Sequence, residues 1–210
     1  MTAIPDAETF RSKFDVSRET LQRLGILHDL VLKWTQRINL ISRDSQGSLW
    51  GRHIADSAQL WALRPEAART WADLGSGAGF PGLVIAALAV EAAPDLSLTL
   101  VESDARKAVF LAEAARAIGV AVRIENRRIE SMPPLAADVI SARALAPLEV
   151  LLGLLEKHRA AGGIGLFPKG AAVHKELETA ARTWRFERRL HGSITQPGAA
   201  ILEIGAVSRA

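Results

Sequence analysis

A glycine-rich segment, residues 72–82 (ADLGSGAGFPG), has the residue types and spacing of a ligand-binding loop. It follows a short apolar run and precedes an apolar run typical of a helix, and four of its residues are glycines: Gly75, Gly77, Gly79 and Gly82. Glycine lets the backbone turn sharply and approach a ligand closely. A plain turn between a strand and a helix needs only one or two glycines. We therefore expect Gly75 and Gly77 to face a ligand.

Two classes of ligand fit this loop. The spacing Gly77-x-Gly79-x-x-Gly82 satisfies the dinucleotide fingerprint, in which a pyrophosphate lies on the helix N-terminus. Glu102 ends the next predicted strand, where its carboxylate would accept the ribose hydroxyls of NAD or of S-adenosylmethionine. Asp73 favours the second ligand, because a carboxylate at a strand tip attracts a sulfonium and repels a pyrophosphate. A capping role for Asp73 is the alternative.

The first 65 residues are predicted to be helical. Apolar residues recur at helical spacing from Ile26 to Ile41, and a second amphipathic helix is expected from about Ser48 to Leu63. Arg64-Pro65 should end it, because the residue before proline avoids the α region. We expect residues 1–65 to form an N-terminal helical extension.

From Thr70 onward, short apolar runs alternate with helical patterns. Five runs, TWADL, LSLTLVE, VAVRIE, ADVISA and GGIGLFPK, are predicted as parallel strands, because alternation with helices indicates βαβ units. Two final runs, TWRFERRL and AAILEIGAV, are predicted as an antiparallel pair. The sequence thus predicts an α/β fold over residues 66–210, a mostly parallel seven-stranded sheet with helices on both faces. Such a terminal pair is typical of methyltransferases, whereas dinucleotide-binding domains usually continue parallel.

Composition excludes several kinds of chemistry. The 210 residues contain no cysteine, which excludes disulfides, thiolate zinc sites and cysteine nucleophiles. The five histidines lack paired ligand spacing, so no metal site is expected. The longest apolar stretch, Leu83 to Val90, is too short to cross a bilayer, and the start lacks a signal-peptide pattern. We expect a cytoplasmic protein without membrane association.

Seven segments taken together resemble the bacterial RsmG (GidB) family, which methylates guanine N7 in 16S ribosomal RNA. They are LKWTQRINLIS (32–42), RHIADS (52–57), ADLGSGAGFPG (72–82), LVESDARKAVFL (100–111), RRIE (127–130), ISARALAPL (140–148) and FPKG (167–170). Each is modest alone, but their order and spacing are specific. The resemblance implies a Rossmann-like class I methyltransferase that uses S-adenosyl-L-methionine. This sequence departs from the family pattern at Thr35, where the family has asparagine, and at residues 196–200, which lack a basic residue common before the last strand.

The resemblance also implies the residues of the cofactor pocket: Gly75, Phe80, Ile129, Glu130 and Arg143. The main chain of Ile129 and the carboxylate of Glu130 would read the adenine edge. Arg143 would hold the cofactor carboxylate or a nucleotide phosphate, and it is the candidate for positioning the reacting groups. Alternatives stay open: Phe80 as plain core, Glu130 as a solvated charge, and an ion pair between Arg143 and Glu149.

Guanine N7 is a lone-pair nucleophile without a proton, so this reaction needs orientation rather than a general base. The absence of cysteine excludes methylation at pyrimidine C5 through a covalent adduct. No Asn/Asp-Pro-Pro-aromatic motif follows the fourth strand, which argues against exocyclic amines as acceptors.

Arginine outnumbers lysine 20 to 6, as expected either of phosphate binding or of a GC-rich genome. The clustering of arginines near the third and sixth strands favours phosphate binding. Candidate RNA-binding residues are Arg123, Arg127, Arg128, Lys169, Arg188, Arg189 and His53, the last with a packing role as the alternative. The expected partner is 16S ribosomal RNA or the small subunit, bound by a monomer. The rival functions are an NAD-dependent oxidoreductase and a non-catalytic RNA-binding protein.

Overall fold

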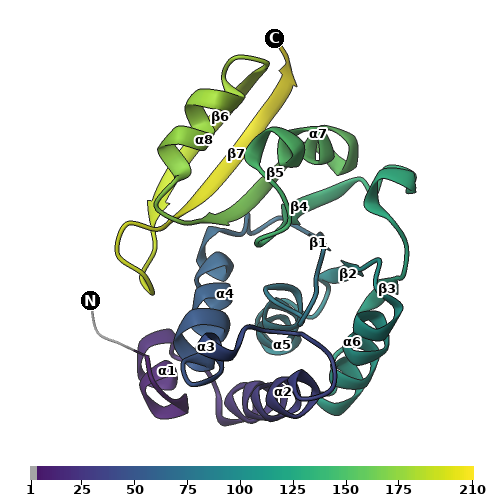
Figure 1. Cartoon of the computed structure of the whole chain (residues 1–210). Helices are drawn as coiled ribbons and strands as arrows, with labels where there is room; N and C mark the ends of the chain where they lie inside the picture. Colours follow the sequence, from purple (N-terminus) through teal and green to yellow (C-terminus); the bar gives the residue numbers. More distant parts are fainter. Residues whose placement is uncertain (1–3) are drawn as a thin grey trace.

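The computed structural model describes residues 4–210 and has one sheet of seven strands in the order β3-β2-β1-β4-β5-β7-β6 (Figure 1). The first five strands in this order, β3, β2, β1, β4 and β5, pair in parallel with their neighbours, and β7 runs antiparallel to both β5 and β6. The strands are β1 (Thr70–Leu74), β2 (Ser97–Val101), β3 (Arg123–Glu125), β4 (Ala137–Ser141), β5 (Arg159–Lys169), β6 (Trp184–Gly192) and β7 (Ala200–Arg209). The predicted fold class is confirmed, including the terminal antiparallel pair.

Helices cover both faces of the sheet, and the alternation of side chains along each strand supplies apolar groups to each face. Trp71 of β1 and Val139 of β4 pack in one buried cluster with residues of α5, whereas Ala72 and Ile140 pack in another with α7 and α8. The helices that follow strands are α5 (Gly82–Ala92), α6 (Ala105–Ala117), α7 (Leu148–His158) and α8 (Val173–Ala180). A 3-10 turn, Ile129–Ser131, lies between β3 and β4.

The first 65 residues are helical in the described part, but the boundaries differ from those predicted. The helices are α1 (Ala7–Phe14), α2 (Arg18–Thr35) and α3 (Arg43–Gln46). Ser17 caps α2 by accepting a hydrogen bond from the backbone N–H of Thr20. Because α2 ends at Thr35, the prediction of one helix through Ile41 is wrong. Ile38 and Ile41 still pack on the core, but they do so from a loop.

The second predicted helix is one continuous helical segment with three geometries. A π-helical stretch (Trp50–Ala55) leads into α4 (Asp56–Ala58) and a 3-10 stretch (Gln59–Leu63). Arg64 then adopts an extended backbone before Pro65, which confirms the predicted stop. Short π-helical stretches are frequent at functional sites, and this one carries Arg52 and His53.

Helix α5 joins the helical extension to the sheet. Its residues from Gly82 to Ala89 are all buried. Leu83, Val84 and Leu88 pack with α1 and α2, whereas Ile85 and Ala86 pack with the strands. The predicted domain boundary at residue 65 stays a prediction, but the helical extension and the sheet domain both pack on α5 and so share a core.

The strand order reverses between β1 and β4, and the crevice outside the carboxyl ends of such strands is the usual ligand site in open α/β sheets. The glycine loop follows β1, and the segment 142–147 follows β4, so both lie at this crevice. Among residues 4–210, each helix is too short or too polar to cross a bilayer.

Candidate active site

The glycine loop after β1 has a backbone that other residues would strain. Gly75, Gly77 and Gly79 have φ angles of +69°, +55° and +85°. A Cβ atom at Gly75 would lie 2.6 Å from Leu145 Cδ1, closer than van der Waals contact allows. The backbone N–H groups of Gly75 and Ser76 both donate to the carbonyl of Val101, which fixes the loop against β2. The bare, fixed backbone that the sequence predicted is present.

Asp73 lies beneath the glycine loop, not on its surface. The side chain is 1% exposed, and its carboxylate accepts hydrogen bonds from Ser141 Oγ at 2.7 Å and from the Gly82 N–H at 3.2 Å. These contacts tie β1 to β4 and to the start of α5. This is the capping alternative, and a contact between Asp73 and the cofactor stays a prediction that this placement does not favour.

Burial raises the pKa of Asp73 from 3.8 to about 6, against the opposing effect of its hydrogen bonds with Ser141, Ser76 and Gly82 and of the charge on Arg143. The fold therefore favours the protonated carboxyl. Asp73 contributes stability that is complete below pH 3.8 and is lost as pH rises through about 6, a change of about 3 kcal/mol.

We expect Asp73→Asn to remove this pH dependence. The free energy of unfolding of the wild type, minus that of the variant, should fall by about 2 kcal/mol between pH 4 and pH 6.5, because part of the full change lies outside this range. Urea denaturation at a series of pH values measures both. Comparing the two proteins cancels the contributions of the other carboxylates, and a difference that stays constant over this range would contradict the buried, protonated state.

A small cavity of about 280 Å³, here the loop cavity, opens beside the glycine loop. It is lined by five predicted cofactor residues, Gly75, Gly77, Glu102, Ile129 and Glu130, and by Arg128 and Lys107 among others. The Glu102 carboxylate is 2.9 Å from the Gly77 N–H and 2.8 Å from the Asp104 N–H, so both donors fix its orientation. Each oxygen keeps a lone pair for a ribose hydroxyl. The geometry suits a nucleoside.

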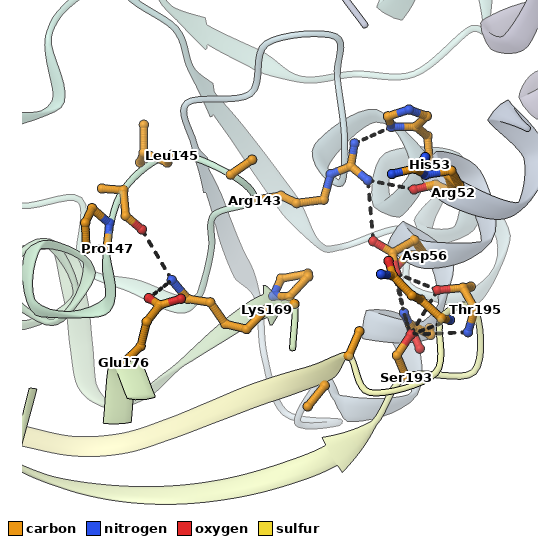
Figure 2. A pocket seen from close by; sticks show the side chains of 18 residues that line it. Arg52, His53, Asp56, Arg143, Leu145, Pro147, Lys169, Glu176, Ser193 and Thr195 are labelled. Atoms are coloured by element: carbon orange, nitrogen blue, oxygen red, sulfur yellow. Dashed lines mark hydrogen bonds and ion pairs between the residues drawn. The ribbon is translucent and has the colours of Figure 1, made fainter. Parts of the chain in front are cut away.

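A second cavity of about 700 Å³, here the large cavity, lies next to it and shares Ala144 and Leu145 with it. Figure 2 shows its walls: Arg143, Asp56 and Thr195 on one side, and Leu145, Pro147 and Lys169 on the other. Lys169 donates to Glu176 at 2.7 Å and to the carbonyl of Ala146 at 3.3 Å. Lys169 thus faces the cavity, where the sequence placed it at the strand end.

Arg143 connects the helical extension to the strand ends. Its guanidinium donates to the carbonyl of Arg52 at 2.9 Å, pairs with Asp56 at 3.4 Å and contacts His53 Nδ1. The alternative of a pair with Glu149 is wrong, because Asp56 takes that place. Arg143 lines the large cavity rather than the loop cavity. Its predicted contact with the cofactor stays a prediction.

Phe80 turns into the core. Its side chain is 4% exposed and packs with residues of the helical extension, with its ring centroid 5.2 Å from that of His53 and 5.6 Å from the Arg143 guanidinium carbon. The core alternative therefore describes this side chain. Any contact of Phe80 with a cofactor would be made by the main chain.

His53 is held uncharged. Burial, and then the charges of Arg143 and Arg52, lower its pKa from 6.5 to about 3. Nδ1 contacts Arg143, and Nε2 is buried without a partner among the described residues. His53 also lines the large cavity. A neutral imidazole is poorly suited to a phosphate, so its charge state favours the packing role, and the RNA contact of His53 stays a prediction.

The predicted RNA-binding arginines fall into separate places. Arg123 in β3 and Arg127 after it both pair with Glu125, whereas Arg188 and Arg189 lie in β6, at the other edge of the sheet. Six strand spacings separate β3 from β6, roughly 30 Å. Arg128 lines the loop cavity and is therefore not grouped with Arg123 and Arg127. The clusters seen in the sequence do not form one surface.

Sequence reasoning missed part of the large cavity. Arg52, Gln59, Ser193 and Thr195 line it, as does Asp56, whose helical segment was expected from the sequence to have a packing or pocket-lid role. The motif RHIADS was a usable signal, because it places Arg52 and Asp56 one helical turn apart, and Gln59 follows Asp56 by another three residues. Thr195 had no signal of its own, since a turn between two strands is usually exposed. No group of three or more metal-ligating side chains occurs in residues 4–210.

Residues 20–203 match the GidB family, which is described as rRNA small subunit methyltransferase G. The chain belongs to this family. A ribosomal RNA small subunit methyltransferase G from Ruegeria sp. (strain TM1040) is 50% identical over 94% of this chain and 96% of its own length. Another GidB relative, from Ruegeria pomeroyi, is 50% identical over 98% of both chains. The predicted family is confirmed.

Similarity to solved structures shows the fold of this chain. A SAM-dependent methyltransferase from Aquifex aeolicus superimposes with a TM-score of 0.57 at 13% identity, covering 86% of this chain and 97% of the other. The Rossmann-like methyltransferase fold predicted from the strand pattern is thereby confirmed.

Proposed function

We propose that this protein transfers the methyl group of S-adenosyl-L-methionine to N7 of a guanine in the 16S ribosomal RNA of the small subunit. The observation that carries the proposal is family membership over nearly the whole chain, together with two cavities that meet at the carboxyl ends of β1 and β4. Family membership favours neither the NAD-dependent oxidoreductase nor the non-catalytic RNA-binding protein.

The loop cavity is proposed to hold the cofactor, which supplies an electrophilic methyl group on a sulfonium. Glu102 accepts the ribose hydroxyls, Gly75 and Gly77 leave room for close approach, and Ile129 and Glu130 border the adenine. The φ angle of +69° at Gly75 is one that residues with a side chain rarely adopt, and a Cβ there would also have to displace the end of the Leu145 side chain, so the loop favours glycine at this position. Lys107 and Arg128 line the same cavity.

The large cavity is proposed to hold the acceptor guanine. N7 carries a lone pair, so no residue has to remove a proton. The protein contributes orientation, which in favourable cases lowers a barrier by about 7–11 kcal/mol. Arg143 is the positioning residue, because it fixes both the segment 143–147 and the helical extension around the cavity. Lys169 lies on the opposite wall, where it would hold the acceptor nucleotide.

Ribosomal RNA as substrate implies a cytoplasmic protein, and we propose that it acts as a monomer. Affinity for RNA is proposed to come from exposed arginines, including Arg188 and Arg189 on the edge strand β6. Arg189 is 78% exposed and lies 3.7 Å from Glu203. A pair that exposed contributes little to stability, which leaves the arginine free to bind phosphate.

Charge reversal at both positions, Arg188→Glu with Arg189→Glu, should weaken RNA binding and flatten its salt dependence. Each lost phosphate contact reduces the slope of log K against log [salt] by roughly 0.7–0.9. Filter binding of 16S ribosomal RNA over a range of salt concentrations measures this. Arg123→Glu with Arg127→Glu, at the other edge, is the matched comparison. An unaltered slope for the β6 variant would remove that edge from the RNA contacts.

The reaction itself is tested by mass spectrometry of nucleosides. Ribosomal RNA from a strain lacking this gene should lack one 7-methylguanosine, and the purified protein with S-adenosyl-L-methionine should restore it. Identical 7-methylguanosine content in both strains would defeat the proposal. A different methylated nucleoside would correct the acceptor atom.

A further inference from the structure

The large cavity contains a carboxylate that the proposed methyl transfer does not use. Asp56 stands at the end of the π-helical stretch and lines the cavity beside Arg143 (Figure 2). Its side chain is 18% exposed. A carboxylate at the wall of a cavity needs donors, and within residues 4–210 only one of its two oxygens receives short hydrogen bonds.

Oδ1 of Asp56 accepts two short hydrogen bonds, from Thr195 Oγ1 at 2.7 Å and from Gln59 Nε2 at 2.8 Å. Gln59 is itself fixed, because its Oε1 accepts from the backbone N–H of Ile194 at 3.0 Å. Oδ2 has one long contact, 3.4 Å from Arg143. Oδ1 is therefore saturated, and Oδ2 keeps acceptor capacity toward the cavity.

The position of Asp56 suits one edge of a guanine. For transfer, N7 must face the loop cavity, which meets the large cavity at Ala144 and Leu145. Figure 2 shows Asp56 and Leu145 on opposite sides of Arg143. A purine whose N7 points toward Leu145 turns its N1 and C2 away from it, toward Asp56. In guanine these positions carry the N1–H and the 2-amino group, which are both donors.

We propose that Asp56 selects guanine by accepting a hydrogen bond from the 2-amino group of this edge through Oδ2. The inference rests on the proposed function, since it assigns a specificity-determining residue to that reaction. Adenine has a lone pair at N1 and no amino group at C2, so it would leave Oδ2 unpaired in a partly buried site. Leaving such a group unpaired is the effective way for a site to reject a similar ligand.

Glu176 is the rival carboxylate on the cavity wall. Its Oε2 accepts from Lys169 at 2.7 Å and from the Leu148 N–H at 2.9 Å, which ties it to the neighbouring elements. It lies on the side of the cavity where Leu145 and Pro147 stand. Glu176 therefore serves as the matched control for Asp56.

The test compares two 16S ribosomal RNAs, joined from synthetic pieces, that carry guanosine or inosine at the nucleotide methylated in vitro. Inosine lacks only the 2-amino group. Methyl transfer from radiolabelled S-adenosyl-L-methionine gives kcat/KM for each RNA. The wild type should prefer guanosine by about 10- to 100-fold, the usual effect of a hydrogen bond to a charged group.

Asp56→Asn should lower kcat/KM for guanosine by a similar factor and bring the ratio for the two RNAs close to one. The donors on Oδ1 would orient the asparagine so that its NH2 faces the cavity, which puts a donor against a donor. Glu176→Gln should keep the wild-type ratio. Thr195→Val, which loosens Asp56 without removing it, should lower both rates and also keep the ratio.

An unchanged ratio in Asp56→Asn, or a ratio lost in Glu176→Gln instead, would overturn the role of Asp56 while leaving methyl transfer standing. Absence of transfer to either RNA by the wild type would defeat the proposed function, and the role of Asp56 with it. S-adenosylhomocysteine binding by each variant, measured by calorimetry, reports whether the fold and the loop cavity are intact.

Discussion

Gly75→Asp is expected to abolish binding of S-adenosyl-L-methionine. The φ angle of +69° strains any side chain, and a Cβ there would lie 2.6 Å from Leu145 Cδ1. The new carboxylate would also enter the loop cavity beside Glu102, so that two like charges would share one site. Isothermal titration calorimetry with S-adenosylhomocysteine measures the loss.

Gly119→Asp is the matched control for this variant. Gly119 follows α6 with a φ angle of +67°, and a Cβ there would meet nothing within 4 Å. It therefore imposes the same backbone strain without filling a cavity. Binding should be lost in Gly75→Asp and retained in Gly119→Asp, with both proteins folded by circular dichroism. Wild-type affinity in folded Gly75→Asp would show that the cofactor binds elsewhere.

Arg143→Ala is expected to lower both methyl transfer and stability. Truncation leaves the carboxylate of Asp56, the carbonyl of Arg52 and Nδ1 of His53 without their shared donor. Unpaired groups of this burial cost about 2–4 kcal/mol of unfolding free energy in total. Misplacing the cavity wall by about 1 Å should lower kcat on the order of 100-fold.

The exposed pair of Arg106 and Asp104 supplies the control for Arg143. Arg106 is 73% exposed, so Arg106→Ala should leave the unfolding free energy nearly unchanged. Urea denaturation and a methyl-transfer assay on both variants separate the two effects. If Arg143→Ala kept wild-type kcat, Arg143 would be a structural residue without a positioning role.

Much of the fold was predictable because local patterns agree with the tertiary structure. The short apolar runs correspond to the seven strands, and Arg64-Pro65 ended the helical segment where expected. The end of α2 was not predictable in this way. Ile38 and Ile41 continue the apolar spacing past Thr35, because the loop that carries them packs on the same core. Apolar periodicity indicates which residues are buried, and here the buried residues continue beyond the end of the helix at Thr35.

The residues of the candidate site likewise fall into those that local sequence patterns indicate and those that only the tertiary structure brings together. The glycine loop and Glu102 could be found because the spacing within a βαβ unit is local. The partner of Arg143 could not, since Asp56 lies 87 residues earlier in the chain and meets it only through the packing of the helical extension. Asp73 shows a third case: its residue type fitted both a ligand contact and a cap, and only its burial beneath the loop favours the cap.

Helix α5 has no solvent-facing stripe along most of its length, since neighbours enclose it on every side. It also begins directly at the end of the glycine loop. A surface helix can tilt a little toward water when a neighbour changes, but an enclosed one transmits the change along its axis. We therefore expect enlarged or shortened side chains on the inner face of α2, such as Leu24 or Leu27, to disturb cofactor affinity from a distance. Substitutions in the first forty residues, far from the loop cavity, would then lower the affinity for S-adenosyl-L-methionine.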